Sequence, residues 1–168
     1  MKRLVADTGP IIHLSEARAV HLLPLIGATI VPPRILPELH AHASALGPGN
    51  LPDWLVIETL SPAAQARAQG WERAGLLHGG EAEALALAVE IKPDWFITDD
   101  AAARLMAESL GLEAHGSLGV VLWTAANKLI ATTEAEAHLA ALERSSLWMS
   151  PKVRAAARAA MAKVVASR

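Results

Sequence analysis

Short apolar segments alternate with longer helix-forming segments along most of this chain. The short segments are rich in β-branched and aromatic residues and stop at proline or acidic residues, as many strands do. An alternating order of strands and helices favours a parallel sheet with helices on its faces. We therefore predict a three-layer α/β/α fold with a central parallel sheet of about four to five strands. The strands are expected at residues 3–6, 29–31, 54–59, 95–98 and 112–114.

Several of the expected helices begin with residues that are typical of helix starts. Ser61 and Ser150 each precede a proline, so each is expected to cap a helix whose first residue is that proline. Asp100 is expected to cap a helix that ends at Gly111. The stretch 70–80 has no clear pattern. The helices are expected at about 11–16, 17–25, 33–45, 62–69, 81–89, 100–110, 118–126, 133–143 and 151–165, with a loop at 47–53.

The length and composition exclude several classes of protein. The 168 residues fit one domain, so a single domain is expected over 1–168. The absence of cysteine excludes disulfides and thiolate metal sites and fits a reducing compartment. The first apolar segment is interrupted too early for a signal peptide, and no apolar run is long enough to span a bilayer. We therefore expect a cytoplasmic protein.

The formal net charge of −2 conceals a basic C-terminal end. From residue 145 onward the sequence has basic residues and no acidic ones, and all but the last of these basic residues fall within an expected helix at about 151–165. Such a helix could contact phosphates, or it could simply have a solvated basic face. Both interpretations stay open. The basic residues are Lys152, Arg154, Arg158, Lys163 and Arg168.

Acidic residues stand at the ends of two expected strands and at the start of a helix. Asp7 directly follows the first strand, Asp99 and Asp100 follow the strand at 95–98, and Glu81 begins a helix. Open α/β sheets bind their ligands at the carboxyl ends of the strands, and carboxylates are the ligands that Mg²⁺ prefers. Acids brought together there would repel one another, so raised carboxylate pKa values are expected without a cation.

Each of these acids also has a simple structural interpretation. Asp7 could form a turn, Glu81 could favour the helix dipole and Asp100 could cap its helix. Asp7-Thr8-Gly9 is also the tripeptide of aspartic proteases, but those enzymes need two such carboxylates and one copy is present. The five tryptophans are scattered without basic residues between them, so no base-stacking surface is predicted.

Four motifs, in this order and spacing, resemble the PIN-domain nucleases. The resemblance extends over nearly the whole chain and is to the VapC-like branch of bacteria and archaea, whose members are often paired with antitoxins. The motifs are Ala6-Asp7-Thr8-Gly9-Pro10-Ile11-Ile12, Gly80-Glu81-Ala82-Glu83-Ala84-Leu85, Ile97-Thr98-Asp99-Asp100 with Ala103-Arg104, and Gly116-Ser117-Leu118-Gly119-Val120.

The resemblance implies a fold, an activity and a set of site residues. It implies a parallel sheet flanked by helices and an acidic cluster that binds Mg²⁺ or Mn²⁺ and hydrolyses RNA. It also implies a small antitoxin as partner and a homodimer. The catalytic acids would be Asp7, Glu38, Glu81 and Asp100; the metal ligands would be Asp7, Glu81, Asp99 and Asp100; and Thr8 and Thr98 would orient the ligands or phosphate oxygens.

Some assignments have alternatives. Glu58 is a second acid in the region of Glu38, and Glu83 lies close to Glu81 in the sequence. Two residues apart on a helix, Glu81 and Glu83 point about 200° apart, so both are not expected to be ligands. Two other functions are also considered. One is a non-catalytic PIN-fold module that binds RNA or protein, and the other is a metal-dependent nuclease acting on DNA.

Overall fold

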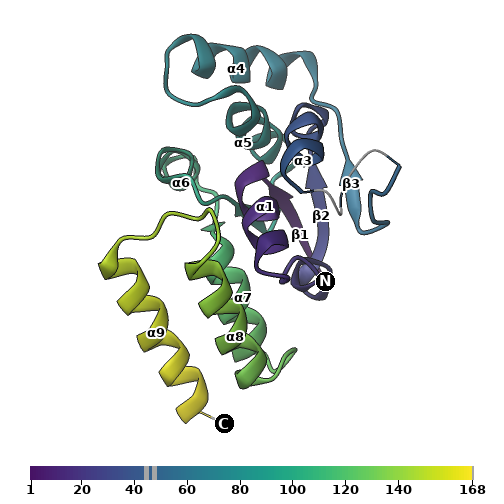
Figure 1. Cartoon of the computed structure of the whole chain (residues 1–168). Coiled ribbons are helices and arrows are strands. Elements are labelled where there is room, and N and C mark those ends of the chain that lie inside the picture. The colour runs from purple at the N-terminus through teal and green to yellow at the C-terminus, as the bar shows by residue number, and fades with distance from the viewer. Residues whose placement is uncertain (44–45, 47–48, 168) are drawn as a thin grey trace.

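A five-stranded parallel sheet forms the centre of the molecule in the computed structural model, which describes residues 1–43, 46 and 49–167 (Figure 1). The strand order is β3-β2-β1-β4-β5, and every neighbouring pair is parallel. The predicted parallel sheet flanked by helices is therefore confirmed. The strands are β1 Lys2–Ala6, β2 Gly27–Val31, β3 Leu55–Ile57, β4 Trp95–Ile97 and β5 Ala114–His115.

Helices cover both faces of this sheet (Figure 1). Their bounds are α1 Thr8–Glu16, α2 Leu22–Ile26, the 3₁₀ helix η1 Pro33–Ile35, α3 Leu36–His42, α4 Pro62–Arg73, α5 Gly79–Ile91, α6 Ala101–Ser109, α7 Ser117–Ala126, α8 Thr132–Glu143 and α9 Pro151–Ala166. Among the described residues, no helix combines the length and the apolar composition that crossing a membrane requires.

The core is divided in two because successive side chains of a strand point to opposite faces. In β1, Leu4 belongs to a core cluster that includes residues of α1, α2, α3, α7, α8 and α9, whereas Val5 belongs to a cluster with residues of α4, α5 and α6. In β4, Trp95 and Ile97 join the first cluster and Phe96 joins the second. The central strands are apolar on both faces, as expected for a parallel sheet covered by helices.

Tertiary contacts move several helix boundaries away from the predicted ones. α1 begins at Thr8 rather than residue 11, with Asp7 as its cap, so that Pro10 lies in the first turn where its missing N–H costs little. The expected helix at 17–25 is confined to Leu22–Ile26, because Arg18 has a φ of 55° and ends α1 in a left-handed turn.

Other boundaries shift by a few residues. α4 extends to Arg73, and Gly75, with a φ of 68°, makes the turn that leads toward α5. The expected helix at 33–45 consists of η1 and α3, which ends at His42. Residues 44 and 45 of that prediction, and residues 47 and 48 of the expected loop, lie outside the described residues.

The sheet topology fixes where a site can form. From β1 the chain moves to β2 and β3 on one side, and it later returns to β4 and β5 on the other. The carboxyl ends of β1 and β4 therefore flank the topological switch point, where open parallel sheets bind ligands. Ala6 pairs with Ile97 in the register, so the residues that follow the two strands lie side by side.

Gly27→Ala is expected to destabilise the protein, because the added Cβ would overlap the backbone carbonyl of Lys2 in the neighbouring strand. Forcing β2 away from β1 should lower the free energy of unfolding by about 1 to 3 kcal/mol. Gly70→Ala is the matched control, since a Cβ there meets no described atom beyond its own helix within 4 Å, and alanine favours a helix. Urea unfolding measures both. Equal midpoints would show that the approach of β2 to β1 does not require Gly27.

Candidate active site

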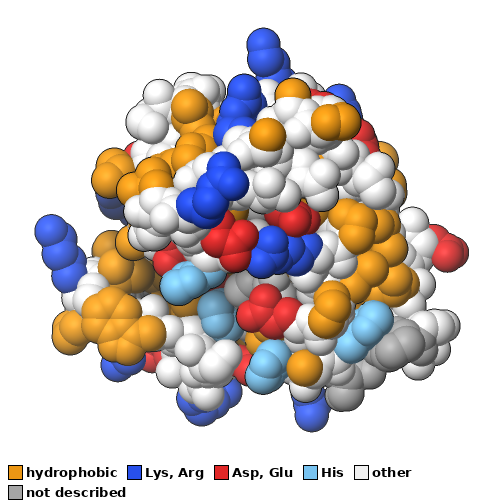
Figure 2. Space-filling model, turned by 90° about the horizontal axis from the view of Figure 1, so that it is seen from above, with side chains coloured by type: hydrophobic (Ala, Val, Ile, Leu, Met, Phe, Trp, Pro, Cys, Tyr) orange, Lys and Arg blue, Asp and Glu red, His pale blue; other side chains and the backbone are white. Residues whose placement is uncertain are grey.

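A pocket of about 570 Å³ opens at the carboxyl ends of β1 and β4. Figure 2 views the molecule from above this edge and shows acidic and histidine side chains gathered near the middle of the face. Every predicted site residue except Thr98 lines the pocket, and Thr98 is fully buried. The lining residues are Asp7, Thr8, Gly9, His13, Glu38, His78, Gly80, Glu81, Asp99, Asp100, Ala101, Ser146, Leu147 and Trp148.

Asp7 is the most buried acid of the pocket, with 4% of its surface exposed. Its backbone N–H donates to the carbonyl of Ile97 at 2.9 Å, which fixes it between β1 and β4. Its Oδ1 accepts a hydrogen bond from the backbone N–H of Thr8 at 2.6 Å, and its Oδ2 accepts one from the hydroxyl of Thr98 at 3.3 Å. Asp7 thus both caps α1 and presents its carboxylate at the switch point.

The surroundings of Asp7 disfavour its charged form. Burial raises its pKa to about 7, and the negative charges of Glu81 and Glu38 add to this, although the hydrogen bonds from Thr8 and Thr98 act against it. The pKa of Glu81 is also raised, first by burial and then by the charges of Asp100 and Glu38. The expected rise of carboxylate pKa values is confirmed for these two acids, but burial contributes more than the repulsion on which the expectation rested.

Glu81 lies in the first turn of α5. Its Oε2 accepts a hydrogen bond from the backbone N–H of His78 at 3.0 Å, so it helps to start the helix as well as lining the pocket. Glu83 does not line the pocket, and its carboxylate lies 3.6 Å from the guanidinium of Arg34. Of these two acids, the structure therefore brings Glu81 and not Glu83 to the predicted site.

The two glycines before Glu81 give other groups room. A Cβ at Gly79 would overlap the guanidinium of Arg34, which forms a bidentate pair with Glu72 at 2.8 and 3.1 Å. A Cβ at Gly80 would lie 3.6 Å from the hydroxyl of Thr8 and 3.8 Å from the carboxylate of Glu38. Gly80 therefore faces both of these pocket residues, and Glu38 reaches the site from α3. Glu58 is not among the lining residues.

Thr98 connects the two strand ends. Its hydroxyl donates to Asp7 and accepts a hydrogen bond from the backbone N–H of Asp100 at 3.2 Å. Asp100 in turn caps α6, because its Oδ1 accepts from the backbone N–H of Ala103 at 2.7 Å. A single buried hydroxyl thereby sets the positions of Asp7 and Asp100 relative to each other.

Asp99 is held by protein donors on both of its oxygens. Its Oδ1 accepts from the backbone N–H of Ser117 at 2.7 Å, and its Oδ2 accepts from the Ser117 hydroxyl at 2.5 Å and contacts Nδ1 of His13 at 2.7 Å. A Cβ at Gly116 would lie 2.6 Å from Oδ1, so glycine leaves the room that this carboxylate needs. Asp99 thus joins α1 to the start of α7, and its role as a metal ligand stays a prediction.

These residues stand in the four motifs from which a family was predicted, and the family comparison covers them all. Residues 3–163 match the sequence model of the DUF3368 family, described as a PIN domain. The chain belongs to the PIN-domain family. Members of this family are generally nucleases, whereas the VapC-like branch stays a prediction. Neither a curated protein nor a solved structure matches the chain.

The donor atoms of the PIN-domain pocket fit a hard divalent cation. They are carboxylate oxygens together with the Thr8 hydroxyl, which is buried and has no hydrogen-bond partner among the described residues. Among the residues that the structure describes, no three acids of the pocket bring their ligand atoms within 4.8 Å of one another. Such an open arrangement suits Mg²⁺ or Mn²⁺, because Mg²⁺ usually keeps several water ligands and needs few carboxylates.

Trp148 is a pocket residue that the sequence did not identify. It lies in the segment between α8 and α9, lines the pocket, and is 83% exposed. Ser146 anchors this segment, because its backbone N–H and hydroxyl both donate to the carboxylate of Glu16, at 2.7 and 2.9 Å. The contact joins residues 130 positions apart, so no local pattern could have placed Trp148 beside the acids.

Asp7→Asn is expected to stabilise the metal-free protein near and above pH 7. The pKa of Asp7 rises from 3.8 to about 7 on folding, so the folded state binds more protons between about pH 4 and pH 7. The free energy of unfolding of the wild type should therefore fall as the pH rises through this range and then level off, by at most about 4 kcal/mol. Asparagine still caps α1 and avoids this loss.

Urea unfolding in EDTA, measured at several pH values from 4 to 8.5, compares the two proteins. The difference in unfolding free energy between Asp7→Asn and the wild type should grow with pH across the range and then become constant. Parallel curves for the two proteins would show that Asp7 ionises without cost in the folded state.

Proposed function

We propose that this PIN domain is a Mg²⁺- or Mn²⁺-dependent endoribonuclease that hydrolyses phosphodiester bonds of RNA. The observation that carries the proposal is the buried carboxylate of Asp7, whose pKa is raised to about 7, at the switch point of the sheet. A buried carboxylate that is costly to ionise is typical of a functional site, because acids with strongly shifted pKa values cluster at such sites. Glu38, Glu81 and Asp100 line the same pocket.

Asp7, Glu81 and Asp100 would hold the cation, with the Thr8 hydroxyl beside them and Asp99 as a further candidate. A bound divalent cation supplies an activated water and neutralises charge on the phosphate under attack. The residues fit this role, because oxygen donors are what Mg²⁺ and Mn²⁺ select. A bound cation would also offset the cost of burying Asp7, because it favours the ionised carboxylate.

The chain itself positions the reacting groups. Thr98 holds Asp7 and the backbone of Asp100, and Asp99 fixes the start of α7 and His13. Glu38 is exposed on α3 at the pocket, where its carboxylate can accept a proton from an attacking water. The acids of the pocket repel phosphate in the absence of a cation, so productive RNA binding requires the metal.

The central test is cleavage of single-stranded and structured RNA, and of DNA of the same sequence, with Mg²⁺, with Mn²⁺ and with EDTA. We expect metal-dependent cleavage of RNA by the wild type. Glu81→Gln should reduce the rate at least about 100-fold, because even residues that only orient metal ligands cost 10- to 100-fold. Glu83→Gln is the matched control on the same helix and should change the rate less than about twofold, since Glu83 lies outside the pocket.

Each other outcome of this test selects an alternative. Metal-dependent cleavage of DNA but not RNA would identify a DNA nuclease. RNA binding without cleavage under any metal condition would identify a non-catalytic module. Cleavage that persists in EDTA or in Asp7→Asn would show that the acidic pocket is not the active site. Asp99→Asn tests whether Asp99 positions α1 and α7 or binds the metal. If Asp99 positions these helices, the substitution should lower thermal stability as well as activity.

Trp148→Ala should weaken the use of single-stranded RNA. An exposed indole beside the acids offers a face for a nucleobase, and stacking on one base contributes about 1 to 3 kcal/mol. The KM should rise about 5- to 150-fold while kcat changes little, and Trp148→Phe should recover part of the loss. Leu129→Ala, another exposed apolar side chain, which lies outside this pocket, is the control. Equal KM values for Trp148→Ala and the control would exclude a base-stacking role.

We place this nuclease as the toxin of a toxin–antitoxin pair and as a homodimer, on the strength of the resemblance to the VapC-like branch. An open pocket lined by five acids suits the insertion of a basic side chain from an antitoxin. The neighbouring reading frame tests this role. A small gene whose product has a DNA-binding N-terminus supports it, and the absence of such a gene leaves a nuclease without this partner.

The basic helix α9 contributes less free charge than its sequence suggests. Arg158 and Arg154 lie 2.9 and 3.7 Å from the carboxylate of Glu143 in α8, whereas Lys152 and Lys163 are exposed. Ala157 and Met161 bury the opposite side of the helix. This favours the interpretation of α9 as a packed surface helix, with the two lysines as its contribution to RNA binding.

A further inference from the structure

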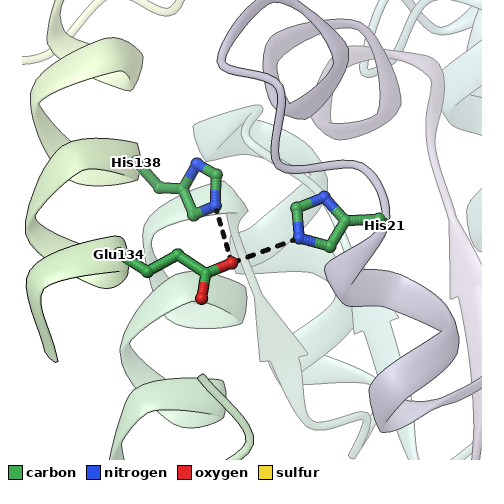
Figure 3. A group of neighbouring side chains, drawn as sticks. All are labelled: His21, Glu134 and His138. Carbon is green, nitrogen blue, oxygen red and sulfur yellow. Dashed lines mark ion pairs between the residues drawn. The ribbon is translucent and has the colours of Figure 1, made fainter. Parts of the chain in front are cut away.

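We propose that His21, Glu134 and His138 form a second metal site, separate from the acidic pocket, which takes Zn²⁺. Figure 3 shows the two imidazole rings and the carboxylate converging, with Glu134 and His138 on α8 and His21 just before α2. None of the three lines the acidic pocket. They are the one group of three metal-binding side chains, among the described residues, whose ligand atoms all lie within 4.8 Å of one another.

The distances fit a metal ion better than a direct contact. Nε2 of His21 and Nε2 of His138 each lie 3.6 Å from Oε1 of Glu134. This is too long for a hydrogen bond. Ligands about 2.0 to 2.1 Å from a tetrahedral Zn²⁺ are about 3.3 Å apart, so each of these two distances is within a few tenths of an ångström of the value for a zinc site.

His138 is prepared for such a role by its surroundings. Its Nδ1 lies 3.2 Å from the backbone carbonyl of Ala17, an acceptor that requires the proton to be on Nδ1. The lone pair of Nε2 then points toward Glu134, and Nε2 is buried with no hydrogen-bond partner among the described residues. Histidine ligands are commonly oriented in this way, with one ring nitrogen donating to a carbonyl and the other free for the metal.

The type and spacing of the ligands favour zinc over magnesium. Glu134 and His138 are four residues apart, so α8 places them on the same face. Two imidazole nitrogens and one carboxylate are the donors of many zinc sites that keep a fourth position for water, whereas Mg²⁺ prefers oxygen donors. The site therefore differs in chemistry from the acidic pocket, whose donors are oxygen atoms.

A bound Zn²⁺ would join α8 to the turn between α1 and α2. That turn begins just after Glu16, which holds Ser146 in the segment that follows α8. The metal would therefore hold the N-terminal half of α8 against this turn, whereas the contact between Ser146 and Glu16 holds the segment after α8.

Metal binding to EDTA-treated protein tests the proposal. With Mg²⁺ in excess to occupy the acidic pocket, Zn²⁺ titration by calorimetry, and the visible absorption of Co²⁺ as a substitute, should show one ion per chain in the wild type and in Asp7→Asn. A saturating ion should raise Tm by roughly 5 °C. His21→Ala and Glu134→Gln change exposed side chains and should weaken Zn²⁺ binding at least about tenfold while the fold is kept. Glu136→Gln, an exposed acid on the same helix, is the control.

Three outcomes would overturn this site. Unchanged Zn²⁺ affinity in both His21→Ala and Glu134→Gln would show that these residues do not bind the ion. Loss of binding in Asp7→Asn alone would place zinc in the acidic pocket. If the Tm has the same value and the same dependence on pH with and without Zn²⁺, the three side chains bind protons and do not bind the metal. The first and third results leave the proposed nuclease activity untouched, because that activity depends on the acidic pocket.

Discussion

The hydrogen bond between the backbone N–H of Asp7 and the carbonyl of Ile97 determines the geometry of the acidic pocket. It continues the pairing of β1 with β4 by one residue and brings together two segments about 90 positions apart in the sequence. Once Asp7 is fixed there, Thr98 stands next to it and Asp100 begins α6 beside both. The acidic pocket is therefore a consequence of strand order, because any other neighbour for β1 would leave Asp7 without Thr98 and Asp100.

The same pairing explains why Asp7 is costly to keep ionised. The carboxyl end of a central strand is enclosed by the helices that cover both faces, so a residue there loses water. Two hydrogen bonds to the carboxylate do not balance this loss, and its pKa rises to about 7. Glu38 is exposed, whereas Asp7 is 4% exposed. The pocket thus combines one buried acid with others nearer to solvent, an arrangement that would suit the proposed cation and an incoming phosphate.

Much of this could be predicted where the signal is local. The acids at strand ends, the Ser-Pro caps and the alternation of strands and helices all depend on neighbouring residues. The structure confirms the sheet, and the family comparison confirms the family. The start of α1 was missed because Asp7, expected to end a strand, also caps the helix. The donors to Asp99 and the position of Trp148 come from segments far away in the sequence, and a single sequence holds no record of such contacts.

The two clusters of ligand side chains differ in a way that would let them select different metals. The acidic pocket offers carboxylate and hydroxyl oxygens, which suit Mg²⁺ or Mn²⁺, whereas the cluster on α8 offers two imidazole nitrogens and one carboxylate, which suit Zn²⁺. They are linked through Glu16, since it ends α1 and holds Ser146 after α8. An ion at the second site would hold the N-terminal half of α8 against the turn after Glu16 without touching the acids, so each site could be occupied independently of the other.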